Sequence, residues 1–499
     1  MRRPAGRPGK RHRSPFPGRR AARASGPCWG RPFRPAASAL LGAAMNAPAA
    51  PAPSAAPPPE RPPERLRHTV PLLAYAGWLV AAGFFFYAWV LRVAPSITVE
   101  PLMRDFAVGG AIVGNLSAVY FWAYAALQIP CGLFTDRWGP RRVLTVAILA
   151  TGVGCAVMGL APSIELAYAG RALIGFGAAF AFVGSMVIAA LWLPARRFAF
   201  FSGVALAVGL AGGVIGQGPF AAAVAALGWR DYMVALAGWA LVHALLAWLL
   251  IRDRPRSAQA GGPESALSAS PGPESPGPEP MRSSLVRALR RPQNFLLAAF
   301  AFLMSVPILA FGGLWGVPYT VARFGVDTTA AGFAMAAMLL GVACGGPLWG
   351  LVSDRIGRRK PVLLAGGLLG LATIGAAIYL PGLPFAAFQV CVFLSGFGGA
   401  AMVTAFALGR EHNDARSAGT ALGLINMCTV LSGAVSQPLI GLLLDLSWAG
   451  DTVNGARVYA LPAYEGAFLL LPATYAAGLL IWLALKETHA KPFAEPGTG

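Results

Sequence analysis

The chain has 499 residues, of which 56% are hydrophobic and only 12% are charged. Its mean hydropathy of +0.59 excludes an ordinary soluble globular protein and predicts a membrane protein. A formal net charge of +20 would by itself suggest a nucleic-acid partner. However, the cations gather in an N-terminal segment and in short loops between apolar runs, so nucleic-acid binding is not predicted.

Residues 1–69 are rich in Pro, Arg, Ala and Gly, and they show no apolar periodicity. Such a composition cannot bury a core, so we predict a disordered basic tail. The tail lacks the continuous apolar stretch of a signal peptide, and its prolines disfavour an amphipathic transit helix. Met45 lies inside this tail, and we expect the true reading frame to start there.

Apolar stretches of about 18 to 25 residues follow, which is the length that a helix needs to cross ~30 Å of hydrocarbon. A Pro-, Gly-, Ser- and Glu-rich stretch, residues 255–292, is predicted to be a flexible cytoplasmic linker between residues 70–254 and 293–486. Residues 487–499 form a C-terminal tail. The spans are predicted at 72–94, 110–131, 143–161, 166–190, 200–226 and 231–251, and at 294–318, 329–350, 361–380, 384–408, 418–444 and 464–485. The predicted fold class is all-α, with six membrane helices in each half.

The cations of the connecting loops predict how the spans are oriented. They gather after the even-numbered spans, for example at Arg141 and Arg142 and at Arg358 and Arg359, whereas the other loops hold few or none. The positive-inside rule therefore places both termini in the cytoplasm. We expect a monomeric, multi-pass protein of the cell membrane in contact with lipid.

One loop motif occurs twice, between the second and third spans and between the eighth and ninth. The first copy reads Gly132-Leu-Phe-Thr-Asp136-Arg137-Trp-Gly139-Pro-Arg141-Arg142. The second copy reads Gly350-Leu-Val-Ser-Asp354-Arg355-Ile-Gly357-Arg-Arg359-Lys360. Internal repetition of this kind is typical of secondary transporters.

The repeated motif resembles a loop of major facilitator superfamily transporters, and the resemblance covers about residues 72 to 485. It implies two pseudo-symmetric six-helix bundles that expose a central site to each side of the membrane in turn. In that family the loop closes the cytoplasmic gate; the alternative is that its cations only anchor the topology. The predicted gating residues are Asp136, Arg137, Arg141, Asp354, Arg355 and Arg359.

Ionisable groups inside a span cost several kcal/mol to bury without a partner, so they are candidates for function. Arg92, followed in the second span by Tyr120, Tyr124 and Gln128, resembles the organic-anion branch of the superfamily, the anion:cation symporter and sialin-like group. In that branch an Arg at this place contacts a substrate carboxylate, for which a guanidinium offers a bidentate fork. The alternative is an Arg that snorkels to the membrane surface from the end of its helix.

Arg171 heads a stretch that resembles the fourth-helix signature of many proton-coupled members, where the Arg is linked to proton transfer or anion binding. The alternative is a topological role or a pairing with Glu165. Two departures weaken coupling schemes known in the family. Ala178 and Ala179 stand where organic-anion symporters commonly place a Glu, and the fifth-helix antiporter signature survives only as Gly218-Pro219.

Polar side chains in other spans complete the candidates. His243 titrates near neutrality, so it is the candidate for proton coupling, with a packed, uncharged His as the alternative. The in-span amides Gln217, Asn426 and Gln437 are further candidates for substrate binding, with helix packing as the alternative.

The predicted function is secondary or facilitative transport of a small organic anion, with protons as the candidate coupling ion. The alternatives are a facilitator for neutral or zwitterionic solutes such as dipeptides, and a multidrug efflux antiporter. A non-transporting sensor would need a folded cytoplasmic domain, which the tails and linker do not offer. No nucleophile–base pair or phosphate loop suggests an enzyme, and the six scattered cysteines predict neither a metal site nor a cofactor.

Overall fold

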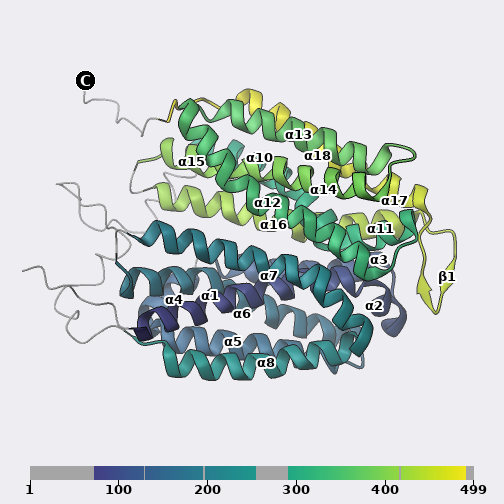
Figure 1. Ribbon diagram of the computed structural model, residues 1–499, viewed down its shortest axis with the longest axis horizontal. Helices are drawn as coiled ribbons and strands as arrows, with labels where there is room; N and C mark the ends of the chain where they lie inside the picture. The colour runs from purple at the N-terminus through teal and green to yellow at the C-terminus, as the bar shows by residue number, and fades with distance from the viewer. Residues whose placement is uncertain (1–71, 129, 195–196, 254–289, 415–416, 491–499) are drawn as a thin grey trace, which may run out of the picture. The chain divides into compact units, whose positions relative to one another are not determined.

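The computed structural model describes residues 72–490 except 129, 195–196, 254–289 and 415–416 (Figure 1). Contacts divide the chain into two units, residues 1–67 and 68–499, and every described residue belongs to the second unit. The predicted tail with its start at Met45, and all of the predicted linker before Arg290, therefore lie outside the described residues.

The first half of the described chain contains eight α-helices and one short 3₁₀ helix. These are α1 (Leu72–Val93), η1 (Ala94–Ile97), α2 (Val99–Phe106), α3 (Gly110–Ala126), α4 (Pro130–Trp138), α5 (Pro140–Gly159), α6 (Ile164–Trp192), α7 (Phe198–Leu227) and α8 (Trp229–Leu250).

The second half adds a π-helical segment, η5, and a two-stranded antiparallel hairpin. Its elements are α10 (Pro292–Val306), η5 (Pro307–Trp315), α11 (Gly316–Phe324), α12 (Thr328–Ile356), α13 (Lys360–Tyr379), α14 (Phe385–Gly399), η6 (Ala400–Met402), α15 (Val403–Glu411), α16 (Ala418–Leu446), β1 (Thr452–Val453), β2 (Ala456–Arg457), α17 (Leu461–Ala467) and α18 (Leu470–Ala484).

The helices confirm the predicted all-α membrane fold. In the described ranges, 11 helices are long and apolar enough to cross a membrane, and the number is 12 if α2 and α3, bent by 115° at their junction, form one span. Each predicted span coincides with one of these helices, apart from shifts of a few residues at the ends. Proline and glycine set several of those ends, because proline fits the first turn of a helix and cannot continue one.

Each copy of the loop motif contains a glycine with a positive φ. Gly139 precedes α5 with φ +80°, and Gly357 follows α12 with φ +66°. An L side chain is strained in this part of backbone space, so the repeated glycine is required by the turn itself. The positive φ is therefore repeated, whereas ψ differs between the copies, at 151° for Gly139 and 22° for Gly357.

The two halves of the bundle meet along two helix pairs, α3 with α16 and α7 with α12. Figure 1 shows the first half in purple to teal and the second in green to yellow. We call the end with α2, β1 and β2 the hairpin end, and the end with the two loop motifs the arginine end. The two pairs are repeat-related, since spans 2 and 5 of one half pack against spans 11 and 8 of the other.

Glycines along these pairs show that the halves touch near the hairpin end. A Cβ atom on Gly114 would lie 2.6 Å from the carbonyl oxygen of Gln437, and one on Gly332 would lie 2.7 Å from that of Gln217. Toward the arginine end, in contrast, Cβ atoms on Gly203 of α7 and Gly423 of α16 would meet no atom within 4 Å. The halves are thus packed closely at the hairpin end, whereas Gly203 and Gly423 face open space nearer the arginine end.

Candidate functional site

Arg92 lies in the last turn of α1, where aromatic rings surround its guanidinium group. The Arg92 Cζ atom is 4.4 Å from the ring centre of Trp89, 5.1 Å from that of Tyr124 and 5.5 Å from that of Tyr120. Phe121 contributes a fourth ring at 5.8 Å. Arg92 is only 9% exposed, so the charge is held in a largely desolvated aromatic cage.

No carboxylate in the described part of the chain forms an ion pair with Arg92. The Arg92 Nε atom is buried and has no hydrogen-bond partner among those residues. A guanidinium carries five N–H donors, and burying its charge without a counter-ion costs several kcal/mol. An anion that enters this cage would satisfy both needs. The burial also disfavours the alternative of an Arg that snorkels into water.

Arg171 of α6 is fully buried beside this cage; both of its Nη atoms donate to backbone carbonyls, and its Nε atom has no partner among the described residues. Its Nη1 donates to the carbonyl of Leu91 at 2.6 Å, and its Nη2 donates to the carbonyl of Arg92 at 3.2 Å. These carbonyls belong to the last turn of α1, where a helix leaves acceptors unsatisfied. These bonds favour a positioning role for Arg171 at the end of α1 that carries Arg92, and its contact with substrate stays a prediction.

Three predicted residues on or just after α3 lie on one face at intervals of four. The rings of Tyr120 and Tyr124 stack with centroids 6.1 Å apart, and Gln128 follows on the same face. Asn426 of α16 donates its Nδ2–H to Oε1 of Gln128 at 3.1 Å, so this contact joins the two halves. The Gln128 Nε2 atom has no partner among the described residues. The predicted set of Arg92, Tyr120, Tyr124, Gln128 and Asn426 therefore converges.

The repeat-related Gln217 and Gln437, in contrast, donate hydrogen bonds to the π-helical segment η5. Gln217 donates to the carbonyl of Gly312, and Gln437 donates to the carbonyl of Leu309 at 2.7 Å. Both carbonyls belong to the π-helical segment, whose hydrogen-bonding pattern departs from that of an α-helix. Both glutamines are fully buried, and these bonds support the packing alternative over a substrate contact.

His243 of α8 is packed inside the first half. Its Nε2 atom is 2.9 Å from the carbonyl oxygen of Val80, and its ring lies among Phe84, Tyr87 and Trp239. The side chain is 4% exposed and points to α1, away from the pairs where the halves meet. This position supports the packed alternative over proton coupling.

The second loop motif forms a charge network at the arginine end. Arg359 donates to Asp354 at 2.6 Å and to Glu411 at 2.7 Å, and its hydrogen bond to Glu411 raises the pKa of Arg359 above its usual range. Glu487 accepts from the backbone N–H groups of Arg359 and Lys360, each at 2.9 Å. Burial would raise the pKa of Glu487, but these hydrogen bonds at the start of α13 lower it. Sequence reasoning missed both Glu411 and Glu487.

The remaining predicted gating residues are also bound within one half or exposed. Arg141 donates to the carbonyl of Trp248 at 2.8 Å and lies 4.1 Å from its ring centre, which ties the first motif to the end of α8. Arg137 and Arg355 are exposed. The side chain of Asp136 lies outside the described residues. A gating role of the motif stays a prediction.

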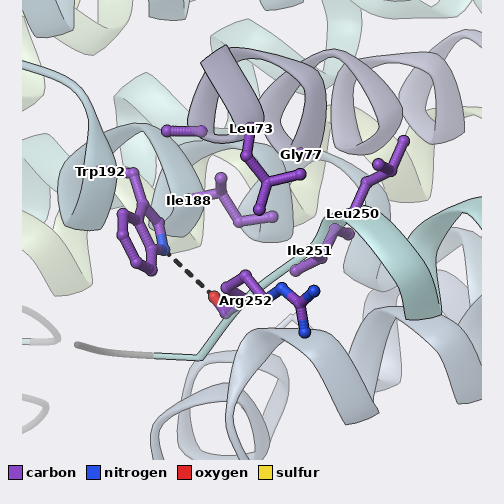
Figure 2. Close-up of a pocket in the computed structure, with 8 residues that line it drawn as sticks. Leu73, Gly77, Ile188, Trp192, Leu250, Ile251 and Arg252 are labelled. Atoms are coloured by element: carbon purple, nitrogen blue, oxygen red, sulfur yellow. Dashed lines mark hydrogen bonds between the residues drawn. The ribbon is translucent and has the colours of Figure 1, made fainter. Parts of the chain in front are cut away.

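Two cavities lie away from this cluster. Figure 2 shows the smaller one, of about 40 Å³, at the arginine end, where Trp192 Nε1 donates to the carbonyl of Arg252 at 3.1 Å. The larger one, of about 240 Å³, lies at the hairpin end and is lined in part by Glu100, Arg457 and Tyr459. Neither contains a residue of the predicted substrate site.

Comparisons with known proteins identify one family and several relatives of similar length. The model of the family described as "Major Facilitator Superfamily" matches residues 73–321 and 309–499. The chain is 25% identical to the "Probable sulfoacetate transporter SauU" of Cupriavidus necator, over 74% of this chain and 86% of that protein. It is 26% identical to the "Membrane sensor protein UhpC" of Escherichia coli, over 79% and 90%. It is 24% identical to the "Probable galactarate/D-glucarate transporter GudP" of Bacillus subtilis, over 74% and 84%.

Among solved structures, the fold is similar to that of a bacterial homolog of the human lysosomal transporter Spinster, in an inward-facing and unoccupied conformation. The TM-score is 0.64 at 18% identity, with 83% of this chain and 96% of that chain covered. It is also similar to a D-xylose-proton symporter, with a TM-score of 0.62 at 17% identity, covering 84% and 99%. At these identities the likeness concerns the fold.

Proposed function

Because this chain belongs to the Major Facilitator Superfamily, and is thus a multi-pass membrane protein and not an enzyme, we propose that it transports small organic anions by alternating access. The observation that carries this proposal is the buried Arg92 guanidinium, which has no carboxylate partner among the described residues. An uncompensated cation favours a substrate with negative charge over the neutral and zwitterionic solutes considered above.

The proposed substrate class is small carboxylates or sulfonates. A guanidinium can bind either group with two parallel hydrogen bonds. Gln128 and Asn426 would bind a second polar group, such as a hydroxyl, because their amides offer both donors and acceptors. The relatives named for sulfoacetate and for galactarate/D-glucarate support this class.

The experiment is uptake into proteoliposomes by the full chain, with labelled dicarboxylates, a sulfonated acid, a neutral sugar and a dipeptide as separate substrates. We expect saturable uptake of one or more anions and no competition by the sugar or the dipeptide. A sensor, the role in the name of one relative, would bind the anion without carrying it. Anion-dependent thermal stabilisation without uptake would therefore favour a sensor.

The positive-inside rule supports a cytoplasmic position for the arginine end, so both loop motifs would face the cytoplasm. Thr452 at the hairpin and Arg358 in the second motif are both exposed. We expect single cysteines at these positions to react with a membrane-impermeant thiol reagent from opposite sides of the membrane. Labelling of both from the same side would refute the proposed topology.

Proton coupling of the proposed transport is expected to be weak. No Asp or Glu within the described spans lies away from a helix end, and His243 is packed against α1. We expect an imposed gradient of one pH unit to change anion accumulation by less than about twofold, well below the tenfold that full coupling to one proton allows. His243→Asn should leave this response unchanged. A steep response lost in His243→Asn would contradict the packing role.

A further inference from the structure

Asp445, near the end of α16, accepts hydrogen bonds from the opposite half of the bundle. Its Oδ1 accepts from the backbone N–H of Gly110 at 2.9 Å, and its Oδ2 accepts from that of Ala111 at 2.9 Å. Both donors belong to the first turn of α3, and the N–H groups of a first turn have no acceptor within their own helix. The positive end of the α3 dipole adds to the attraction. A carboxylate of the second half thus caps a helix of the first.

Within its own half, Asp445 has two further partners. Arg457 of β2 lies 3.1 Å from its Oδ1, and the Tyr459 hydroxyl donates to the same oxygen at 2.5 Å. Arg457 is itself held over the Trp448 ring at 4.3 Å. The negative charge of Asp445 is therefore compensated even without α3.

Glycines on both sides make this approach possible. A Cβ atom on Gly109 would lie 2.5 Å from Asp445 Oδ1, and one on Gly110 would lie 2.9 Å from the Tyr459 hydroxyl. On α16, a Cβ atom on Gly441 would lie 2.3 Å from the carbonyl oxygen of Gly110. Any side chain at these positions would separate the carboxylate from the N-terminus of α3.

We propose that Asp445 is a gating residue, and that its bonds to Gly110 and Ala111 form a latch that holds the hairpin end closed. The latch breaks whenever that end opens. Asp445 then keeps Arg457 and Tyr459, while the α3 amides bind water, so neither side is left with an unpaired buried group. Two states of similar energy make the latch reversible. This inference rests on the alternating access proposed above, but not on the identity of the substrate.

The test measures the distance between the halves at the hairpin end, without substrate. Spin labels are placed at Asp231 and Ala322, exposed residues of opposite halves, in the full chain without its native cysteines and in lipid nanodiscs. Asp445→Asn keeps the shape but loses the charge and turns an N–H group toward an α3 donor. We expect the population with longer distances to rise at least about fivefold. Asp451→Asn is the matched control, an exposed acid of the same loop, and should change nothing.

Two further variants separate a latch from a merely structural cluster. Ala111→Pro removes one donor from the first turn of α3, where proline is tolerated, and should open the hairpin end without any change to the acid. Arg457→Gln removes the partner that Asp445 keeps in the open state. It should therefore shift the population in the opposite direction, toward the state closed at the hairpin end.

The proposal is overturned if Asp445→Asn and Ala111→Pro both leave the distances unchanged, or if Arg457→Gln opens the end as Asp445→Asn does. Uptake by the same preparations keeps the two proposals distinct. An expected shift in distance without any anion uptake by the unmodified chain would refute transport and leave the latch standing.

Discussion

Arg92→Lys should reduce anion uptake at least about 30-fold, because truncating one side of a buried charge pair typically costs 2–5 kcal/mol. A lysine keeps the charge but cannot reproduce the bidentate fork, and a compact ammonium is more strongly hydrated than a guanidinium. The cage of Trp89, Tyr120, Tyr124 and Phe121 is shaped around a planar group. Initial uptake rates and anion-dependent thermal stabilisation, measured together, check this expectation.

Arg104→Lys is the matched control for that experiment. Arg104 lies on α2, its side chain is 44% exposed and its partner is the neighbouring Asp105, so the same chemical change there should leave uptake within about twofold. If Arg92→Lys transports at the rate of this control, Arg92 does not contact the substrate, and its burial needs a structural explanation.

Gly114→Ala should impair transport almost as strongly, by preventing the hairpin end from closing. The added Cβ would lie 2.6 Å from the carbonyl oxygen of Gln437 and 2.8 Å from the Cα of Pro438, and backbone atoms cannot move aside as a side chain can. Overpacking of this kind costs about 1–3 kcal/mol, which corresponds to a shift of roughly 5- to 150-fold toward the state open at the hairpin end. The label pair at Asp231 and Ala322 measures that shift directly.

Gly423→Ala controls for the intrinsic effect of alanine in a helix. It makes the same change in α16, toward the arginine end, where a Cβ meets no atom within 4 Å. We expect normal uptake and an unchanged distance. Equal effects of the two substitutions would show that helix propensity, and not the contact between α3 and α16, decides the outcome.

The features that sequence reasoning predicted correctly depend on spacing along the chain. Apolar runs of membrane-spanning length predicted the helices, and the repeated motif predicted two related halves. Tyr120 and Tyr124 stack because an interval of four residues shares one helix face, and such an interval can be counted directly; their role in substrate binding stays a prediction.

The features that it missed depend on contacts between distant segments. Nothing near Arg171 indicates that its donors meet the last carbonyls of α1, and nothing near Gln217 indicates a bond to η5. A polar group in a span predicts that a partner exists, but not which one. Asp445 and Glu487 were missed for the same reason, because each caps a helix that is remote in sequence.

Arg92, which has no carboxylate partner among the described residues, has an electrical consequence for the transport cycle. The empty site must keep a largely desolvated cation through every rearrangement, whereas a bound monoanion would compensate that charge. The loaded protein should therefore change conformation faster than the empty one, so that exchange of one anion for another outpaces net uptake. The monoanion and the guanidinium would then cross as a neutral pair, and the membrane voltage would act mainly on the return of the empty, positively charged site.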